Sequence, residues 1–258
     1  TKINERLKSR DHTENMLKKN KNSIKIINGK IKKIKVFGKK NLSNFSINVP
    51  GDPSSAAFFT ALTLIKKNSF LKIKNVGLNP TRLGFYSLLK KSGAKINFTN
   101  KRFVNNEQVG DITVKSSILK PLNASSKYYL NTTDEYPILF IISAFINGKS
   151  SFSGISDLKN KESDRVKEMQ KILQQIGVFS KFGKGKLIIK GKKYEQIKRS
   201  NVKVSNLGDH RICMSAAILG LLTGINVKIN NFETVKTSSP NFLKIVKKLG
   251  GSFEKKYI

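Results

Sequence analysis

Three helices that are apolar on nearly every face constrain this fold more than any other feature of the sequence. They are predicted over residues 52–65, 134–146 and 209–222. A helix without a polar face is buried on all sides, so each helix requires its own covering layer. Their opening acids, Asp52, Asp134 and Asp209, lie 82 and 75 residues apart. This regular spacing indicates three consecutive copies of one structural unit.

Each predicted buried helix is followed by the same succession of a strand, a half-exposed helix and further strands. The predicted segments are 70–76, 81–91, 95–98 and 111–115 in the first unit, 151–153, 162–176, 178–182 and 186–190 in the second, and 226–230, 240–249 and 252–255 in the third. We therefore expect an α/β (α+β) fold of β-α-β-α-β-β units at about 50–120, 125–195 and 200–258. Three buried parallel helices would lie under three four-stranded sheets.

The first 49 residues show a different pattern. Asp11 and Glu14 have capping-box spacing at the start of a short helix. Strands at 24–27 and 31–37 flank Asn28-Gly29, which predicts a hairpin with a two-residue turn. A further strand is expected at 45–49, before Pro50-Gly51.

The starts of the three buried helices would gather on one face of the domain. Gathered helix N-termini supply unpaired N–H groups and a positive field, which suit phosphate or carboxylate ligands. N-capping is a sufficient explanation for Asp52. It explains Asp134 and the cluster Asp209-His210-Arg211 less well, because a cap requires neither the histidine nor the arginine.

Charged residues also begin the helix predicted at 162–176. Glu162 and Arg165 lie on the same arc of the helical wheel as the apolar residues, with Lys161 beside them. Burial of charge in a core is costly, so this helix start could face a polar cleft. Alternatively, Glu162 and Arg165 could pair with each other at the edge of the core. The sequence alone leaves both interpretations open.

The chain is strongly basic, with 50 Lys and Arg against 16 Asp and Glu and a formal net charge of +34. This balance favours anionic partners, but the lysines are dispersed and no nucleic-acid-binding signature accompanies them. Cys213, the single cysteine, falls in an apolar helix and is expected to be an inert buried thiol. The apolar run 137–146 is too short to cross a bilayer, and no signal-peptide pattern is visible. We expect a cytoplasmic protein.

Six motifs, in order along the chain, resemble the 5-enolpyruvylshikimate-3-phosphate (EPSP) synthase family, especially the bacterial class that tolerates glyphosate better. They are Ser9-Arg10-Asp11-His12-Thr13-Glu14, Val49-Pro50-Gly51-Asp52-Pro53-Ser54-Ser55-Ala56, Asn79-Pro80-Thr81-Arg82, Asp134-Glu135-Tyr136-Pro137-Ile138-Leu139, Lys161-Glu162-Ser163-Asp164-Arg165 and Asp209-His210-Arg211-Ile212. The resemblance implies the enolpyruvyl transferase fold, with two domains of three units each. Residues 50–258 would form most of one domain and 1–49 the tail of another. Because the chain starts at Thr1, we expect it to be N-terminally incomplete.

The resemblance also implies a reaction, in which the enolpyruvyl group of phosphoenolpyruvate is transferred to the 5-hydroxyl of shikimate 3-phosphate and phosphate is released. Asp134 would hold the shikimate ring and act as base, and Glu162 would be the acid–base partner at the methylene carbon. Arg10 and Lys161 would lie at shikimate 3-phosphate, and Lys161 would bridge the two substrates. Arg165 and Arg211 match the family's ligands of phosphoenolpyruvate. His210 matches a family histidine that lies beside the reacting centre.

The resemblance implies no metal, no organic cofactor and a monomeric complete protein. Two residues depart from the family pattern, Asp157 and Asn160, just before the Lys161 motif. The nearest competing hypothesis is the related enolpyruvyl transferase that acts on UDP-N-acetylglucosamine. The sequence also allows a basic nucleic-acid-binding protein or an inactive fragment. Lys-Glu-Ser-Asp-Arg and Asp-His-Arg favour the shikimate enzyme.

Overall fold

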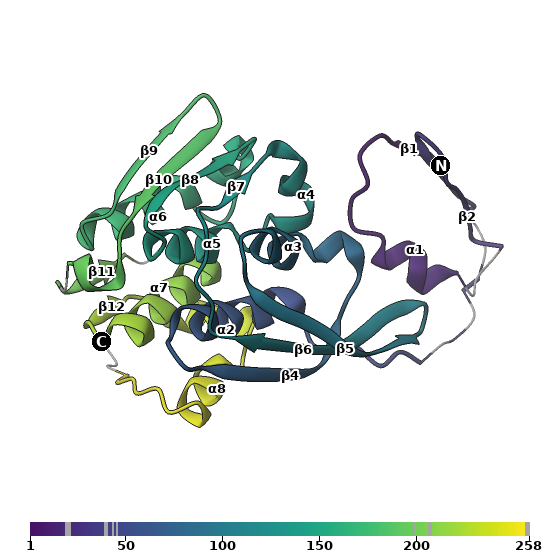
Figure 1. The fold of residues 1–258 in the computed structure, drawn as a ribbon. Coiled ribbons are helices and arrows are strands. Elements are labelled where there is room, and N and C mark those ends of the chain that lie inside the picture. Colours follow the sequence, from purple (N-terminus) through teal and green to yellow (C-terminus); the bar gives the residue numbers. More distant parts are fainter. Residues whose placement is uncertain are drawn as a thin grey trace.

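The computed structural model describes residues 1–18, 22–38, 41–42, 44, 46–198, 200–205 and 208–255. Figure 1 shows a large body of helices and sheets, with a smaller N-terminal part set beside it. A long hairpin of the large body, formed by β5 (Lys95–Val104) and β6 (Glu107–Lys115), extends toward the N-terminal part.

Three buried helices form the centre of the large body, as the sequence predicts. They are α2 (Pro53–Ile65), α5 (Tyr136–Ala144) and α7 (His210–Thr223). Each of the three packs against the other two. One contiguous hydrophobic core includes all three helices. Polar positions within these helices, such as Ser143 and Ser215, return their hydroxyls to backbone carbonyls one turn earlier, which lets them be buried.

Two of the buried helices, α5 and α7, connect a pair of parallel strands. The strand β7 (Asn123–Ala124) pairs in parallel with β8 (Gly148–Ser153), and α5 lies between them in the chain. The strand β11 (Val202–Val204) pairs in the same way with β12 (Val227–Ile229) around α7. In the first unit a single parallel bridge joins Gly51 to Val76 of β4 (Phe70–Gly77). The β-α-β connection inferred from spacing is therefore confirmed in the second and third units, and in the first unit it is reduced to this single bridge.

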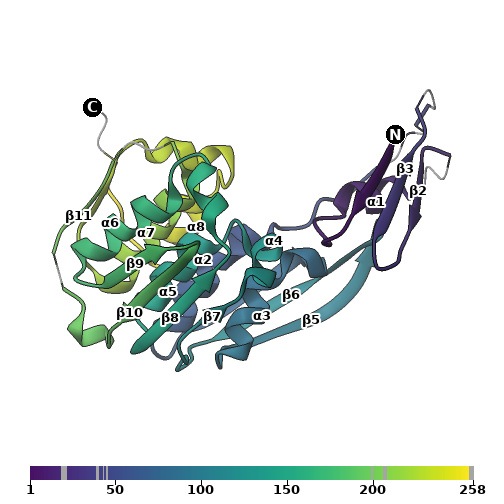
Figure 2. The ribbon, with the colours of Figure 1, turned by 90° about the horizontal axis from the view of Figure 1, so that it is seen from above.

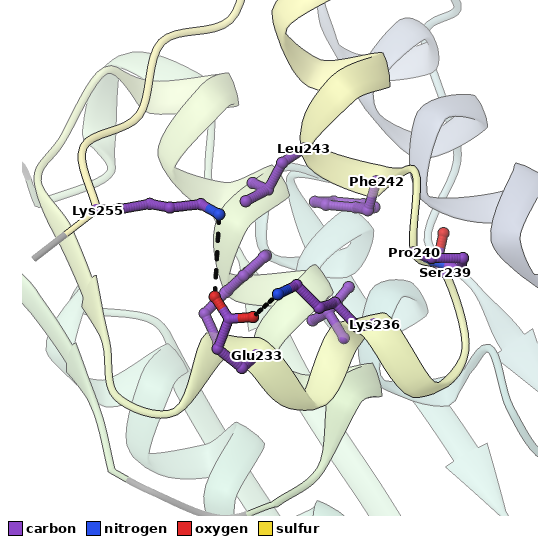
Figure 3. A pocket seen from close by; sticks show the side chains of 9 residues that line it. Glu233, Lys236, Ser239, Pro240, Phe242, Leu243 and Lys255 are labelled. Atoms are coloured by element: carbon purple, nitrogen blue, oxygen red, sulfur yellow. Dashed lines mark ion pairs between the residues drawn. The ribbon is translucent and has the colours of Figure 1, made fainter. Parts of the chain in front are cut away.

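The sheets are less regular than predicted. Among the described residues they have three, four and two strands, in the orders β4-β6-β5, β7-β8-β10-β9 and β11-β12, where β9 is Phe179–Gly183 and β10 is Lys186–Gly191. The expectation of three four-stranded sheets is wrong. The predicted strand 252–255 has no strand structure. Instead this segment passes near a 3-10 helix, η5 (Phe232–Thr237), where Lys255 Nζ lies 3.9 Å from Glu233 Oε1 at the edge of a small pocket (Figure 3).

The half-exposed helices are shorter than their sequence patterns suggest. They are α3 (Gly84–Lys91), α6 (Arg165–Gln175) and α8 (Phe242–Lys248). The predicted helix 81–91 is divided into a 3-10 turn, η1 (Pro80–Arg82), and α3. The remaining short helical segments are η2 (Ser126–Tyr128), α4 (Tyr129–Thr132), η3 (Ser156–Asn160) and η4 (Tyr194–Gln196).

The N-terminal part has its own sheet, in the order β1-β3-β2, and one helix (Figure 2). Its elements are β1 (Lys2–Glu5), α1 (His12–Leu17), β2 (Ile24–Ile27) and β3 (Lys32–Val36). The predicted hairpin is present as antiparallel β2 and β3, but its connection has four residues, 28–31, rather than a two-residue turn.

Two further predictions in this part are wrong or fall partly outside the described residues. The capping box is absent because Asp11 makes no side-chain cap and Glu14 pairs with Lys32. Residues 46–49 have no strand structure, and Phe45 lies outside the described residues.

Candidate active site

The N-termini of the three buried helices meet, and side chains from each connect them. Ser54, in the first turn of α2, donates a hydrogen bond to Glu135 just before α5. Arg211, in the first turn of α7, places Nη2 3.7 Å from Oδ2 of Asp134. The predicted gathering of helix starts is therefore present.

Asp134 is the point on which three guanidinium groups converge. Arg10 Nη2 donates to its Oδ2 at 2.5 Å, while Arg211 Nη2 and Arg165 Nη1 lie 3.7 Å and 4.0 Å from its carboxylate oxygens. Burial alone would raise the pKa of Asp134, but Arg211 and Arg10 outweigh burial and hold the pKa below its usual value. The side chain is therefore an ionised carboxylate at neutral pH.

Asp134 does not cap its helix. The helix α5 begins at Tyr136, and neither Glu135 nor Asp134 makes a side-chain cap bond to it. The interpretation of Asp134 as an N-cap is therefore wrong, since its carboxylate is used by arginines from three other segments. Asp209 does cap α7, accepting from the backbone N–H groups of Arg211 and Ile212.

Arg165 is almost fully buried, with 2% of its side chain exposed. Its Nε donates at 2.9 Å to Oδ2 of Asp209, whose side chain is fully buried. Its Nη2 donates to Glu162, and Nη1 remains on the side of Asp134. The guanidinium thus links α6 to α7 and presents one edge to the site.

The helix expected at 162–176 begins later. Asp164 caps α6 by accepting from Lys167 N, and the helix starts at Arg165. Lys161 and Glu162 therefore precede the helix rather than belonging to its first turn. The alternative in which Glu162 and Arg165 pair with each other is confirmed, whereas the polar cleft stays a prediction. The two residues pair, and Arg165 also contacts the carboxylate of Asp134.

Two side chains at the start of α7 carry buried polar atoms that lack a partner among the described residues. They are Nε and Nη1 of Arg211 and Nε2 of His210. Buried donors without acceptors are costly, so such groups suggest a ligand. Burial and the neighbouring charge of Arg211 hold the pKa of His210 below its usual value, which favours the neutral imidazole.

Lys161 is held by a residue that departs from the family pattern. Its Nζ lies 2.7 Å from Oδ2 of Asp157, which also accepts from the hydroxyl of Tyr129 at 2.6 Å. These contacts tie Lys161 to η3 and α4. They do not include Asp134, so Lys161 flanks the arginine cluster rather than joining it.

A second carboxyl group lies next to Asp134 and was not assigned a role from the sequence. Glu135 is 3% exposed and accepts from Ser54, whose Oγ in turn accepts from Arg82 Nη2 at 2.6 Å. Arg82 Nη2 also donates to Oδ1 of Asp52 at 2.9 Å. The sequence does show that polar residues begin the otherwise apolar helices. It does not indicate which of the two adjacent acids, Asp134 or Glu135, has its side chain buried.

Burial raises the pKa of Glu135 to about 7, although the hydrogen bond from Ser54 opposes the shift. Between about pH 4.5 and 7 the unfolded chain ionises this group while the folded chain keeps its proton. The group therefore supports folding at low pH, and that support, on the order of 3 kcal/mol, is lost as pH rises to about 7.

We expect the substitution Glu135→Gln to remove this pH dependence. Denaturant unfolding of the variant and the wild type should show a stability difference that shifts in favour of the variant between about pH 4.5 and 7.5. Parallel stability curves over that window would show that Glu135 keeps an ordinary pKa in the folded protein.

No cluster of three or more His, Cys, Asp or Glu side chains in the described ranges is arranged to hold a metal ion. Nor does any helix in the part of the chain that the structure describes combine the length and apolar character of a membrane span.

The arrangement of buried helices and parallel connections defines the class of protein first. The enolpyruvyl transferase NikO from Streptomyces tendae has the same fold, with a TM-score of 0.65 over 98% of this chain and 56% of that one, at 12% identity. An EPSP synthase from Acinetobacter baumannii has a TM-score of 0.87 at 31% identity, over 100% of this chain and 58% of that one. The fold is that of the enolpyruvyl transferases.

Within this class, the chain belongs to the EPSP synthase family. The model of the family EPSP synthase (3-phosphoshikimate 1-carboxyvinyltransferase) matches residues 1–246. A 3-phosphoshikimate 1-carboxyvinyltransferase from Zymomonas mobilis is 40% identical over 98% of this chain and 57% of its own length. The corresponding protein of Petrotoga mobilis is 40% identical over 96% of this chain and 56% of its own length. The chain thus spans a little over half the length of these relatives.

Proposed function

We propose that the protein carrying this chain transfers the enolpyruvyl group of phosphoenolpyruvate to the 5-hydroxyl of shikimate 3-phosphate and releases phosphate. Family membership supports this reaction class, and one observation in the site carries it. Arg211 presents two buried N–H donors, without partners among the described residues, beside an ionised Asp134. An anion and a hydroxyl group are the ligands that such a pair would bind.

Asp134 is the proposed base. Its carboxylate takes the proton of the 5-hydroxyl as the oxygen attacks the central carbon of phosphoenolpyruvate. Arg10 contacts the same carboxylate at 2.5 Å, and its guanidinium is the proposed ligand for the phosphate of shikimate 3-phosphate. Binding of the substrate phosphate would then exchange part of the contact between Arg10 and Asp134 for a contact to phosphate.

Glu162 is the proposed acid–base partner. It gives a proton to the methylene carbon during addition, which forms a methyl group on a tetrahedral ketal. It takes a proton back from that methyl group as the bond from the ketal carbon to the phosphate oxygen breaks, and the proton held by Asp134 passes to the departing phosphate. Its side chain is 46% exposed and is held by Arg165. It can therefore exchange protons with solvent between turnovers.

Three further side chains complete the proposed site. Arg211 and the free edge of Arg165 hold the anionic groups of phosphoenolpyruvate, for which guanidinium groups are well suited. Lys161 flanks this cluster and is paired with Asp157. If that ion pair opened, the ammonium group of Lys161 would be able to bridge the two substrates. His210, with its unpartnered Nε2 among the described residues, lies beside Arg211 and near Glu162. The cytoplasmic location and monomeric state expected from the sequence belong to this proposal.

The test is phosphate release that requires both phosphoenolpyruvate and shikimate 3-phosphate. Because this chain spans a little over half of its relatives' length, the assay uses the complete protein that carries it. We expect turnover with the wild type, and for Glu162→Gln a fall in kcat of about 10²- to 10⁴-fold, since it removes a proton donor. The matched control is Glu168→Gln, which alters an ion-paired carboxylate on α6 and should keep kcat near the wild-type value.

Two results would contradict the proposal. Turnover with UDP-N-acetylglucosamine as acceptor, but not with shikimate 3-phosphate, would favour the related transferase. Tight binding of nucleic acid that weakens steeply with salt, without phosphate release from either pair of substrates, would favour a binding protein. The family match and the names of the relatives support the shikimate substrate over both of these.

A further inference from the structure

Contacts between the N-terminal part and the large body are concentrated in one short segment. Residues 10–15, which lead into and form the first turn of α1, make polar contacts with three separate places in the large body. In Figure 1, α1 lies next to the end of the β5–β6 hairpin that extends toward the N-terminal part.

The first group in this interface is Asn79, at the start of η1. Its Oδ1 caps η1 by accepting from the backbone N–H of Thr81 at 2.9 Å. Its Nδ2 donates to two carboxylates, Oδ1 of Asp11 at 2.7 Å and Oε2 of Glu107 at 2.9 Å. One amide group therefore bridges two negative charges from different parts of the chain, which would otherwise repel each other.

The second group is Glu107, the first residue of β6. Its Oε1 lies 2.9 Å from Nδ1 of His12 and accepts from Nδ2 of Asn15 at 3.0 Å. The neighbouring Asn106 adds a bond from Nδ2 to the carbonyl of Asn15 at 3.2 Å. The Glu107 carboxylate thus contacts both ends of the first turn of α1. We call Asp11, His12, Asn15, Asn79 and Glu107 the α1 latch.

The α1 latch begins at the residue directly after Arg10. The side chain of Arg10 is 43% exposed, and its guanidinium donates to Asp134. A long, half-exposed arginine loses considerable rotational freedom when it binds a ligand, unless its backbone is already held in place. The latch holds the two residues that follow Arg10 through the side-chain contacts of Asp11 and His12.

We propose that Glu107 and Asn79 are positioning residues for Arg10, holding α1 so that the Arg10 guanidinium reaches the Asp134 carboxylate and its substrate. The identity of the substrate in this inference, a phosphorylated hydroxy acid, rests on the proposed function. The placement of Arg10 itself is independent of the reaction. The contacts of Glu107 are to α1 and Asn79 rather than to Asp134, so its effect would pass through α1.

The test uses the complete protein with three substitutions. Glu107→Ala removes the acceptor for α1, and Asn79→Asp keeps the cap on η1 but places a third carboxylate against Asp11 and Glu107. Arg10→Ala removes the positioned group. We expect the first two to raise KM for shikimate 3-phosphate about tenfold, with KM for phosphoenolpyruvate and kcat much less affected. The control is Arg102→Ala, on the same hairpin, where Arg102 bonds to Asn75 rather than to α1.

A double substitution separates positioning from general damage to the fold. If Glu107 acts through Arg10, Arg10→Ala combined with Glu107→Ala should have the same KM for shikimate 3-phosphate as Arg10→Ala alone. If the two effects on KM multiply instead, Glu107 acts independently of Arg10 and the proposal is wrong. Glutamine at position 107 can still accept from Asn15, so Glu107→Gln should recover part of the loss.

A measurement without substrate distinguishes failure of this inference from failure of the proposed function. Amide hydrogen exchange in residues 12–17 should become faster in Glu107→Ala and in Asn79→Asp but not in Arg102→Ala. If exchange in residues 12–17 is faster in the two latch variants but the wild-type protein shows no turnover, the latch is supported and the proposed reaction is wrong. Unchanged exchange in the two latch variants would overturn the latch, whatever the protein catalyses.

Discussion

Replacing Asp134 by asparagine is expected to lower kcat by about 10²- to 10⁴-fold, the usual contribution of a general base. The substitution preserves the shape of the side chain but removes the negative charge on which Arg10, Arg165 and Arg211 converge. Three guanidiniums then face one another without that counter-charge. Steady-state kinetics in the complete protein, with thermal unfolding of the same preparation, checks both effects.

Asp164→Asn is the matched control for this variant. Asp164 caps α6 through Lys167 N, and asparagine is an equally good N-cap, so both activity and stability should stay close to the wild type. Wild-type turnover by Asp134→Asn would remove this residue from the chemistry. Loss of turnover accompanied by unfolding would instead assign Asp134 a structural role.

Replacing Arg165 by methionine is expected to destabilise the folded chain by about 3–5 kcal/mol, because it leaves the fully buried carboxylate of Asp209 without its cationic partner. Methionine keeps most of the aliphatic volume, so the loss would come from charge rather than from a cavity. Denaturant unfolding monitored by circular dichroism measures the difference.

Lys171→Met provides the comparison on the same helix. Lys171 and Glu168 form a surface pair, of the kind that contributes about 0–1 kcal/mol. A loss in Arg165→Met no larger than that in Lys171→Met would contradict the buried ion pair that joins α6 to α7.

The buried helices were the most predictable part of the fold. Their apolar character on every face determines burial without knowledge of the partners, and Asp52 with Pro53 marks the start of α2 correctly. The sheets were predicted less well because a strand requires a neighbour that sequence periodicity does not specify. Residues 252–255 were expected to form a strand but have no strand structure, and β11 and β12 form a two-stranded sheet.

The residues of the site were predictable from motifs, but most of their contacts were not. Spacing within one segment suggested the pair Glu162 and Arg165, which the structure contains. The more deeply buried partner of Arg165 is Asp209, which is 44 residues away and reaches it only through the packing of α6 on α7. Likewise, two adjacent acids look equivalent in the sequence, yet Asp134 faces the arginines and Glu135 faces Ser54.

The contacts of the α1 latch also could not be predicted from the sequence. Asp11 and Glu14 had the spacing of a local capping box, but tertiary partners displaced that local arrangement. Asp11 bonds to Asn79 and Glu14 pairs with Lys32. A short helix that packs against another part of the chain gains more from such partners than from its own cap.

The most direct test of the proposed site is a crystal structure of the complete protein with shikimate 3-phosphate and a phosphoenolpyruvate analogue bound. We predict that anionic oxygens lie within about 3 Å of Nε and, separately, of Nη1 of Arg211, and that the shikimate ring hydroxyls contact Asp134. Anions bound on another surface, with both donors of Arg211 still unpaired, would contradict the assignment of this site.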